Sequence, residues 1–214
     1  MVERAHLELA RGDLQNSVVY ALAAASLATL LGIVLGHALE RARAGRLLEP
    51  LVLLPLAVPA ILFGIGVIVA WNRDWSADFY DGGGLVVLLL VGRFAAFPVL
   101  LMGGAVAMLD PALEEAGRVS GAGPAVRLFR IVIPTLRSSW IGGWILVFVF
   151  AVRELDCTIL VPAANKTAMF RVFNAVHFGR DDFVAALSLI TALLILLPGT
   201  LWTLFARRRL EVLP

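Results

Sequence analysis

Five long apolar runs, separated by polar segments, dominate the pattern of hydrophobic and polar positions along the chain. A helix needs about 20 apolar residues to cross the hydrocarbon core of a bilayer, and each run is long enough. The pattern therefore predicts an all-α integral membrane protein, whose spans lie at about 17–39, 50–72, 82–109, 138–161 and 183–206. The composition agrees, because 60% of the 214 residues are hydrophobic and 16% are charged, whereas soluble domains have about 45–50% and about 25%.

The basic residues outside the spans predict how the chain is oriented. Arginine and lysine are enriched in cytoplasmic loops. If the loops alternate between the two sides, one side carries ten basic residues, and the other carries six basic residues beside eight acidic ones. We therefore expect the polar N-terminal segment 1–16 on the outer side. The loop 110–137 and the basic tail 207–214 are expected in the cytoplasm.

The polar loop between the third and fourth spans has the local signals of two short helices. Asp110-Pro111 predicts a helix start, because aspartate caps a helix and proline suits its first position. Gly121 predicts the end of that helix, because glycine tolerates the left-handed conformation of a C-terminal cap. A second short helix is expected over 124–131, and Pro134 predicts the next break.

The second short helix combines charged and apolar side chains. Arg127 and Arg130 are three residues apart, with Leu128 and Phe129 between them. A cytoplasmic helix of this kind either inserts into a groove of another protein or lies on membrane headgroups with its arginines near phosphates. Periodicity alone leaves both interpretations open.

The same loop resembles the EAA loop of ABC-importer permeases. That pattern reads Glu-Ala-Ala, three residues, Gly, nine residues, and Ile-x-Leu-Pro. The residues that match it in spacing are Glu115, Ala116, Gly117, Gly121, Ile131, Ile133 and Pro134. The departures are Gly117 in place of alanine and Ile133 in place of leucine.

The resemblance covers about residues 13–210 and implies the type I ABC-importer permease fold, a five-helix core with a cytoplasmic EAA coupling loop. It implies a transport subunit of the bacterial inner membrane that pairs with a second permease core. Its further partners would be a periplasmic substrate-binding protein and a cytoplasmic ABC ATPase dimer. By this correspondence the residues that couple to the ATPase are Glu115, Ala116, Gly117, Gly121, Arg127, Leu128, Phe129, Arg130, Ile131 and Pro134.

The sequence has no nucleotide-binding loop of its own. A Walker A loop ends in Gly-Lys-Ser/Thr, whereas the only lysine, Lys166, follows an asparagine. The single cysteine and the three scattered histidines indicate neither a metal site nor a catalytic group. We therefore expect a chain that is not an enzyme and binds no cofactor or nucleic acid, with ATP and Mg²⁺ used by the partner subunit.

Four charged residues fall inside the apolar runs, namely Arg93, Arg153, Glu154 and Asp156. A charge at the bilayer centre costs about 2.5–3.5 kcal/mol on insertion scales, so such residues are candidates for a substrate pathway. A structural interpretation competes, because Arg153 and Asp156 would share a helix face as an i,i+3 pair. For Arg93 we favour snorkelling or the capping of a backbone carbonyl.

The fourth span and the segment after it resemble ferric-iron importer permeases, through Arg153-Glu154-Leu155 and Arg171-Val172-Phe173-Asn174. This looser resemblance implies ferric iron as the substrate. Related permeases for polyamines, molybdate, sulfate and thiamine share much of the pattern. Iron-type permeases commonly hold two cores in one chain, so we expect this single core to pair with itself or a sister subunit, or to be the second half of a longer protein.

Two other functional classes compete with a permease. An ion-coupled secondary transporter or channel would use residues 153–156 as an ion relay, but it needs no EAA-spaced loop, and the spans show no inverted repeat. An intramembrane hydrolase needs a nucleophile and a base within the membrane. Ser120 lies in the polar loop and His37 lies only near the end of a span, so the sequence favours the permease.

Overall fold

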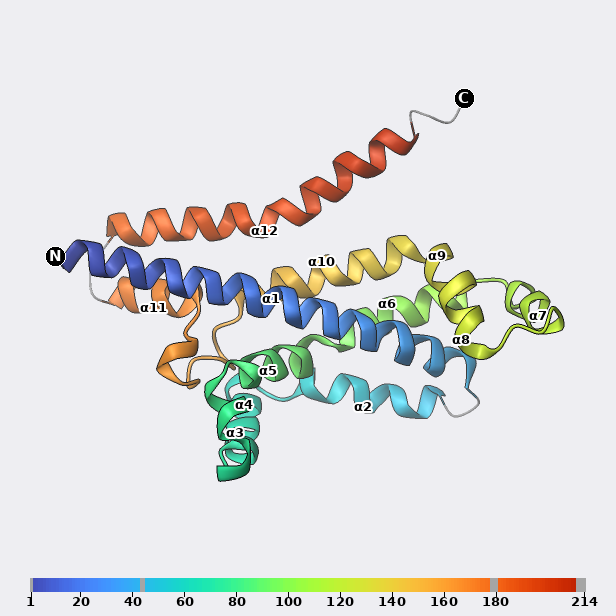
Figure 1. Cartoon of the computed structure of the whole chain (residues 1–214), viewed down its shortest axis with the longest axis horizontal. Helices are drawn as coiled ribbons and strands as arrows, with labels where there is room; N and C mark the ends of the chain where they lie inside the picture. The colour runs from blue at the N-terminus through green and yellow to red at the C-terminus, as the bar shows by residue number, and fades with distance from the viewer. Residues whose placement is uncertain (1, 43–44, 178–180, 211–214) are drawn as a thin grey trace.

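The computed structural model describes residues 2–42, 45–177 and 181–210, and within these ranges the chain forms helices and no strands. Two helices are long and apolar enough to span a membrane alone, and three bent helix pairs raise the number of candidate spans to as many as five. The prediction of an all-helical membrane protein with up to five spans is confirmed. Most helices run along one long axis, and the helices of the polar loop lie at the end opposite the N-terminus (Figure 1).

The first helix, α1 (Val2–Arg41), is longer than the predicted span 17–39. The N-terminal segment 1–16 is not separate from the span, because its backbone from Val2 onward is part of the same helix. One of its polar residues has a partner elsewhere in the fold, since Asp13 is only 7% exposed and forms an ion pair with Arg171. The hydrophobic pattern could not predict this contact, because the two residues are far apart in the sequence.

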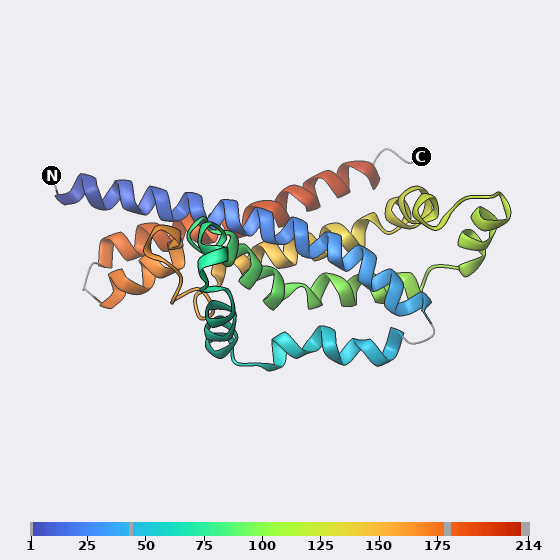
Figure 2. The same ribbon diagram turned by 60° about the horizontal axis from the view of Figure 1, so that its bottom comes forward.

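The second predicted span, 50–72, is a bent pair of helices. It consists of α2 (Gly45–Ala57) and α3 (Ala60–Trp71), which meet at an angle of 102°. Pro59 lies at this break. Proline interrupts a helix there because it lacks an N–H and disfavours a helical conformation of the residue before it. Both views show α3 turned away from the direction of α2 (Figure 2). Two short elements follow, η1 (Asp74–Ser76) and α4 (Ala77–Asp81).

The third predicted span, 82–109, agrees closely with the pair α5 (Gly84–Phe94) and α6 (Ala96–Ala107), which bends by 43°. Alanines of α1, which are fully buried, pack in one cluster with leucines and valines of α5 and valines of the fourth span. Small residues let membrane helices approach closely. The core of the protein therefore lies where α1, α5 and the fourth span meet.

The fourth span is shorter than predicted. Its helix, α10 (Arg137–Arg153), ends where Glu154 adopts an extended conformation, so the predicted helix over 154–161 is wrong. The chain continues through η3 (Ala163–Asn165) and α11 (Ala168–His177) to the last helix, α12 (Asp181–Leu210). This helix contains the fifth predicted span, 183–206, and the first residues of the predicted tail. Residues 211–214 lie outside the described residues.

Candidate functional site

The first helix of the polar loop is α7 (Pro111–Val119), and both of its predicted ends are confirmed. The side chain of Asp110 accepts a hydrogen bond from the backbone N–H of Ala112 at 2.9 Å. At the other end Ser120 is the C-cap, and Gly121 follows with a φ of +82°. Because that value lies in the left-handed region, which favours glycine, the turn after α7 depends on Gly121.

The second helix of the loop does not end at Ile131 as predicted. It runs through α8 (Pro124–Arg127), a π-helical turn η2 (Leu128–Val132) and α9 (Ile133–Thr135). Pro134 is therefore inside the helix, and the break comes at Leu136, where the chain turns by 79° into α10. Proline clashes with the carbonyl four residues earlier in a regular α-helix, and the wider π turn directly before Pro134 relieves this conflict.

The helices α7 and α8 are held together across Gly117. A Cβ atom at this position would lie 2.8 Å from Ile131 Cδ1 and 3.3 Å from Arg127 Cδ, so the glycine allows close contact between the two helices. The Arg127 guanidinium donates a hydrogen bond to the carbonyl of Ala122 in the turn between them at 2.9 Å. Two of the predicted coupling residues, Arg127 and Ile131, therefore stabilise the loop itself.

Leu128, another predicted coupling residue, also faces the interior of its own chain. It packs against a cluster of buried residues in which Met102 and Val106 of α6 meet Val132. Most of the other predicted coupling residues are exposed. Phe129 is 62% exposed, and Glu115, Ala116 and Arg130 are exposed as well. Val119, which was not among the predicted residues, is 87% exposed. The loop thus presents an outward face of mixed apolar and charged side chains.

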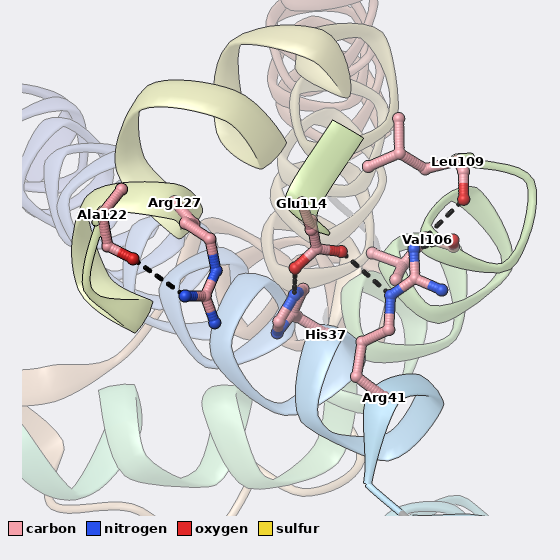
Figure 3. A network of polar contacts seen from close by, with 7 residues as sticks. All are labelled: His37, Arg41, Val106, Leu109, Glu114, Ala122 and Arg127. Carbon is pink, nitrogen blue, oxygen red and sulfur yellow. Dashed lines mark hydrogen bonds and ion pairs between the residues drawn. The ribbon is translucent and has the colours of Figure 1, made fainter. Parts of the chain in front are cut away.

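A polar network, which the sequence analysis missed, attaches α7 to the end of α1 (Figure 3). His37 Nε2 and Glu114 Oε2 are hydrogen-bonded at 2.9 Å, and Arg41 Nε donates to Glu114 Oε1 at 2.9 Å. Arg41 also donates to the carbonyls of Val106 and Leu109, at 3.2 and 3.1 Å. We call His37, Arg41 and Glu114 the α1–α7 network. The sequence signal for it was a carboxylate in the first turn of one helix and basic residues at the end of another.

Glu114 lies outside the predicted spans, and its contacts in the α1–α7 network change the pKa of its carboxyl group. Burial alone would raise the pKa of its carboxyl group. The hydrogen bonds and positive charges of His37 and Arg41 outweigh burial, so the pKa is lowered from its ordinary value of 4.5. Glu114 is therefore ionised at neutral pH and holds a charge-assisted contact with Arg41, which is stronger than a neutral hydrogen bond.

None of the ion pairs found among the described residues joins two of the four charges inside the apolar runs. Arg93 donates hydrogen bonds to the carbonyls of Pro55 and Val58, the latter at 2.6 Å, and so caps the broken end of α2. The predicted helical pairing of Arg153 with Asp156 is wrong, because α10 ends at Arg153. Both side chains are exposed, and Glu154 accepts a hydrogen bond from the backbone N–H of Cys157 at 3.0 Å.

The segment after α10 is attached to the first half of α1 by a second polar network. Arg171 and Asp13 form an ion pair at 2.6 Å. Tyr20 donates to Asn165 Oδ1 at 2.9 Å, and the side-chain amide of Asn16 donates to the carbonyl of Lys166 at 3.1 Å. Arg171 from the Arg-Val-Phe-Asn motif therefore has a structural partner. In the described part of the chain, no three His, Cys, Asp or Glu side chains are arranged to hold a metal ion.

Comparison with known protein families gives a match over most of the chain. Residues 28–211 match the family described as binding-protein-dependent transport system inner membrane component. This range contains the EAA-like pattern, the α1–α7 network and all four charges inside the apolar runs.

Curated relatives include transport permeases of several kinds. The chain is 27% identical to the molybdenum transport system permease protein ModB of Mycobacterium tuberculosis, over 81% of this chain and 71% of that protein. It is 27% identical to the putrescine transport system permease protein PotI of Escherichia coli, over 94% and 76%. It is 26% identical to the ferric transport system permease protein FbpB of Actinobacillus pleuropneumoniae, over 78% of this chain but only 25% of that protein.

The fold is similar to a chain of the inward-facing MetNI methionine ABC transporter. The TM-score is 0.79 at 16% sequence identity, and the match covers 97% of this chain and 99% of that one. At this identity the likeness concerns the fold.

Proposed function

Because the chain belongs to the family of binding-protein-dependent transport system inner membrane components, we propose that it lines the translocation pathway of an ABC importer and couples that pathway to a separate ATPase. Membership of this family makes the chain a non-catalytic, multi-pass permease subunit of the inner membrane. The family also implies an ATPase and a substrate-binding protein as partners.

The observation that carries the coupling proposal is the outward face of the polar loop. Phe129 and Val119 expose large apolar side chains on the loop that also exposes Arg130 and Glu115. Exposed apolar groups rimmed by charges mark a protein contact. We assign docking on the ATPase to this face, with Gly121 setting the angle between α7 and α8. Arg127, Leu128 and Ile131 hold the loop together from inside.

We propose that the polar loop lies in the cytoplasm, with the N-terminus outside and the C-terminus inside. The excess of arginine on one set of loops supports this orientation. The arrangement of helices agrees with it, because the last turns of α12 and the helices α7, α8 and α9 lie toward one end of the molecule, while the N-terminus lies toward the other (Figure 1). A second permease core, from a copy of this chain or a sister subunit, would complete the pathway.

We propose ferric iron as the transported substrate. The support is the resemblance of Arg153-Glu154-Leu155 and Arg171-Val172-Phe173-Asn174 to iron permeases. Glu154 and Asp156 would meet the cation, because negative charges at a pathway attract a trivalent cation. Arg153 beside them would balance their charge. Arg93 is left out of this role because its guanidinium already caps the broken span.

Uptake and affinity purification test the proposal together. A tagged copy of the chain is purified from its native membrane, and the permease-deleted strain carrying the same copy is supplied with labelled ferric iron, molybdate or putrescine. We expect an ATP-binding subunit to co-purify and ferric iron to accumulate. Uptake of molybdate or putrescine instead would overturn the substrate alone. Absence of an ATPase together with absence of uptake would overturn the coupling proposal.

A further inference from the structure

One guanidinium joins three separate helices at the end of the molecule where the polar loop lies. Arg41, in the last turn of α1, contacts the Glu114 carboxylate of α7 at 2.9 Å. The same side chain donates to the carbonyls of Val106 and Leu109, at and just after the end of α6 (Figure 3). His37, one turn earlier in α1, contacts the other oxygen of the carboxylate. Glu114 is therefore held at both oxygens by the end of α1.

The helices α1 and α6 are packed so closely that they form one rigid unit. A Cβ atom at Gly32 would lie 2.7 Å from Pro98 Cβ, and one at Gly36 would lie 2.7 Å from Met102 Cβ. Close contacts of this kind at two positions about one helical turn apart leave little room for sliding. A force applied to the end of α1 is therefore passed to α6.

The helix α7 has few other attachments of its own. None of its residues is buried, and its contact with α8 is made through Gly117 and the turn that contains Gly121. The Glu114 side chain, by contrast, is only 14% exposed. The hydrogen-bonded contact of Glu114 with Arg41 and His37 thus attaches α7 directly to the α1–α6 unit.

We propose that Glu114 is a positioning residue that carries movement of the coupling loop into the α1–α6 unit. This inference rests on the proposed function, because it assumes that an ATPase moves the loop. The other exit of the loop, at Leu136, leads directly into α10. Movement of the docking face would then reach α10 along the backbone. It would reach the α1–α6 unit through Glu114, so that both sides of the core shift together.

The test measures substrate transported per ATP hydrolysed in the complete transporter, reconstituted in vesicles with its binding protein. Glu114→Gln removes the charge but keeps the size of the side chain. We expect assembly with the ATPase to persist and hydrolysis to stay within about twofold, whereas transport per ATP falls about tenfold or more, as the loss of a charge-assisted contact predicts. Glu40→Gln removes a carboxylate from the same end of α1 as the matched control, and we expect no change in the ratio.

A second pair of variants separates a positioning role from a folding role. If Arg41 and Glu114 act through their shared contact, Glu114→Gln causes no further loss of transport per ATP in a chain that already carries Arg41→Gln. A His37→Cys, Glu114→Cys chain bridged by a short thiol-reactive linker regains coupling, because a covalent bond replaces the ionic one. The natural Cys157 does not interfere, since it is 1% exposed.

Each outcome decides between the alternatives. An unchanged transport ratio in Glu114→Gln overturns the inference while leaving the proposed function intact. If none of the three variants assembles (Glu114→Gln, Arg41→Gln and the bridged chain), the contact is needed for folding. That result would also overturn the inference. If the unaltered chain recruits no ATPase, the proposed function fails first, and with it the premise of the inference.

Discussion

Arg41 Nε and Glu114 Oε1 lie 2.9 Å apart, although 73 positions separate the two residues in the sequence. The contact joins the end of the first membrane helix to the first turn of the polar loop. The EAA-like pattern begins one residue later, at Glu115, whose side chain is exposed. Two neighbouring glutamates therefore differ in setting, because Glu114 contacts the end of α1 and Glu115 is exposed.

Acidification should loosen α7 from α1. The pKa of Glu114 is lower in the folded chain than its ordinary value of 4.5, so the contact with His37 and Arg41 contributes fully above about pH 4.5. It is lost as the pH falls further, through the folded pKa. Hydrogen exchange of the α7 amides measures this, and we expect their protection, relative to the intrinsic exchange rate at each pH, to fall below about pH 4.5. A Glu114→Gln chain should show low protection at every pH, and an equal acid response in that variant would contradict the assignment.

Substitution of Gly121 should abolish uptake without removing the protein from the membrane. No atom lies within 4 Å of a Cβ built at this position, so the effect comes from its φ of +82° alone. Gly121→Ala should cost about 1–2 kcal/mol of local backbone strain, and Gly121→Pro cannot adopt this φ at all. Gly123→Ala is the control, because Gly123 has equal space and a φ of −66°. Normal uptake by Gly121→Pro would show that the turn does not matter.

Adding a methyl group between α1 and α6 should destabilise the core. In Gly36→Ala the new Cβ would meet Met102 Cβ and the Val99 carbonyl oxygen, both at 2.7 Å. Overpacking of this kind costs about 1–3 kcal/mol. Gly104→Ala on α6 has no atom within 4 Å of its Cβ and should be neutral or slightly stabilising. The thermal midpoints of the two purified variants compare them directly, and equal midpoints would contradict the close contact.

Arg93→Met should lower stability rather than change the substrate. The variant leaves the carbonyls of Pro55 and Val58 without their donor at the break between α2 and α3. Hydrogen bonds to charged groups contribute about 1.5–3 kcal/mol each, so we expect a lower thermal midpoint and less protein in the membrane. Arg93→Lys keeps a donor and should lose less. A stable Arg93→Met protein with selectively altered transport would instead place Arg93 in the pathway.

Local features of the fold were predictable from the sequence because local chemistry determines them. The apolar runs located the spans, Asp110 located the start of α7, and Gly121 located its end. The breaks were harder to predict. An apolar run reports burial in lipid but not direction, so the turn at Pro59 and the end of α10 at Arg153 were not visible in the hydrophobicity.

The candidate site was predictable only in part, for a related reason. The spacing of Glu115 and Gly121 indicated which loop is the candidate site. It could not indicate that Leu128 packs on its own core or that Glu114 binds α1, because those contacts join residues that are far apart in the sequence. The π turn at Leu128–Val132 depends on how Pro134 fits into a helix that continues past it, and the proline alone predicted a break.

Crosslinking from Phe129 tests the central claim most directly. Cys157 is the only cysteine and is buried, so Phe129→Cys, at a site that is 62% exposed, introduces one reactive thiol on the proposed docking face. Trp75→Cys, at a site that is 75% exposed near α4, is the matched control. In intact cells we predict that a photoactivatable thiol reagent at position 129 captures an ATP-binding subunit and that the same reagent at position 75 does not. Recovery of no nucleotide-hydrolysing protein from position 129, with the permease present in the membrane, would contradict the account.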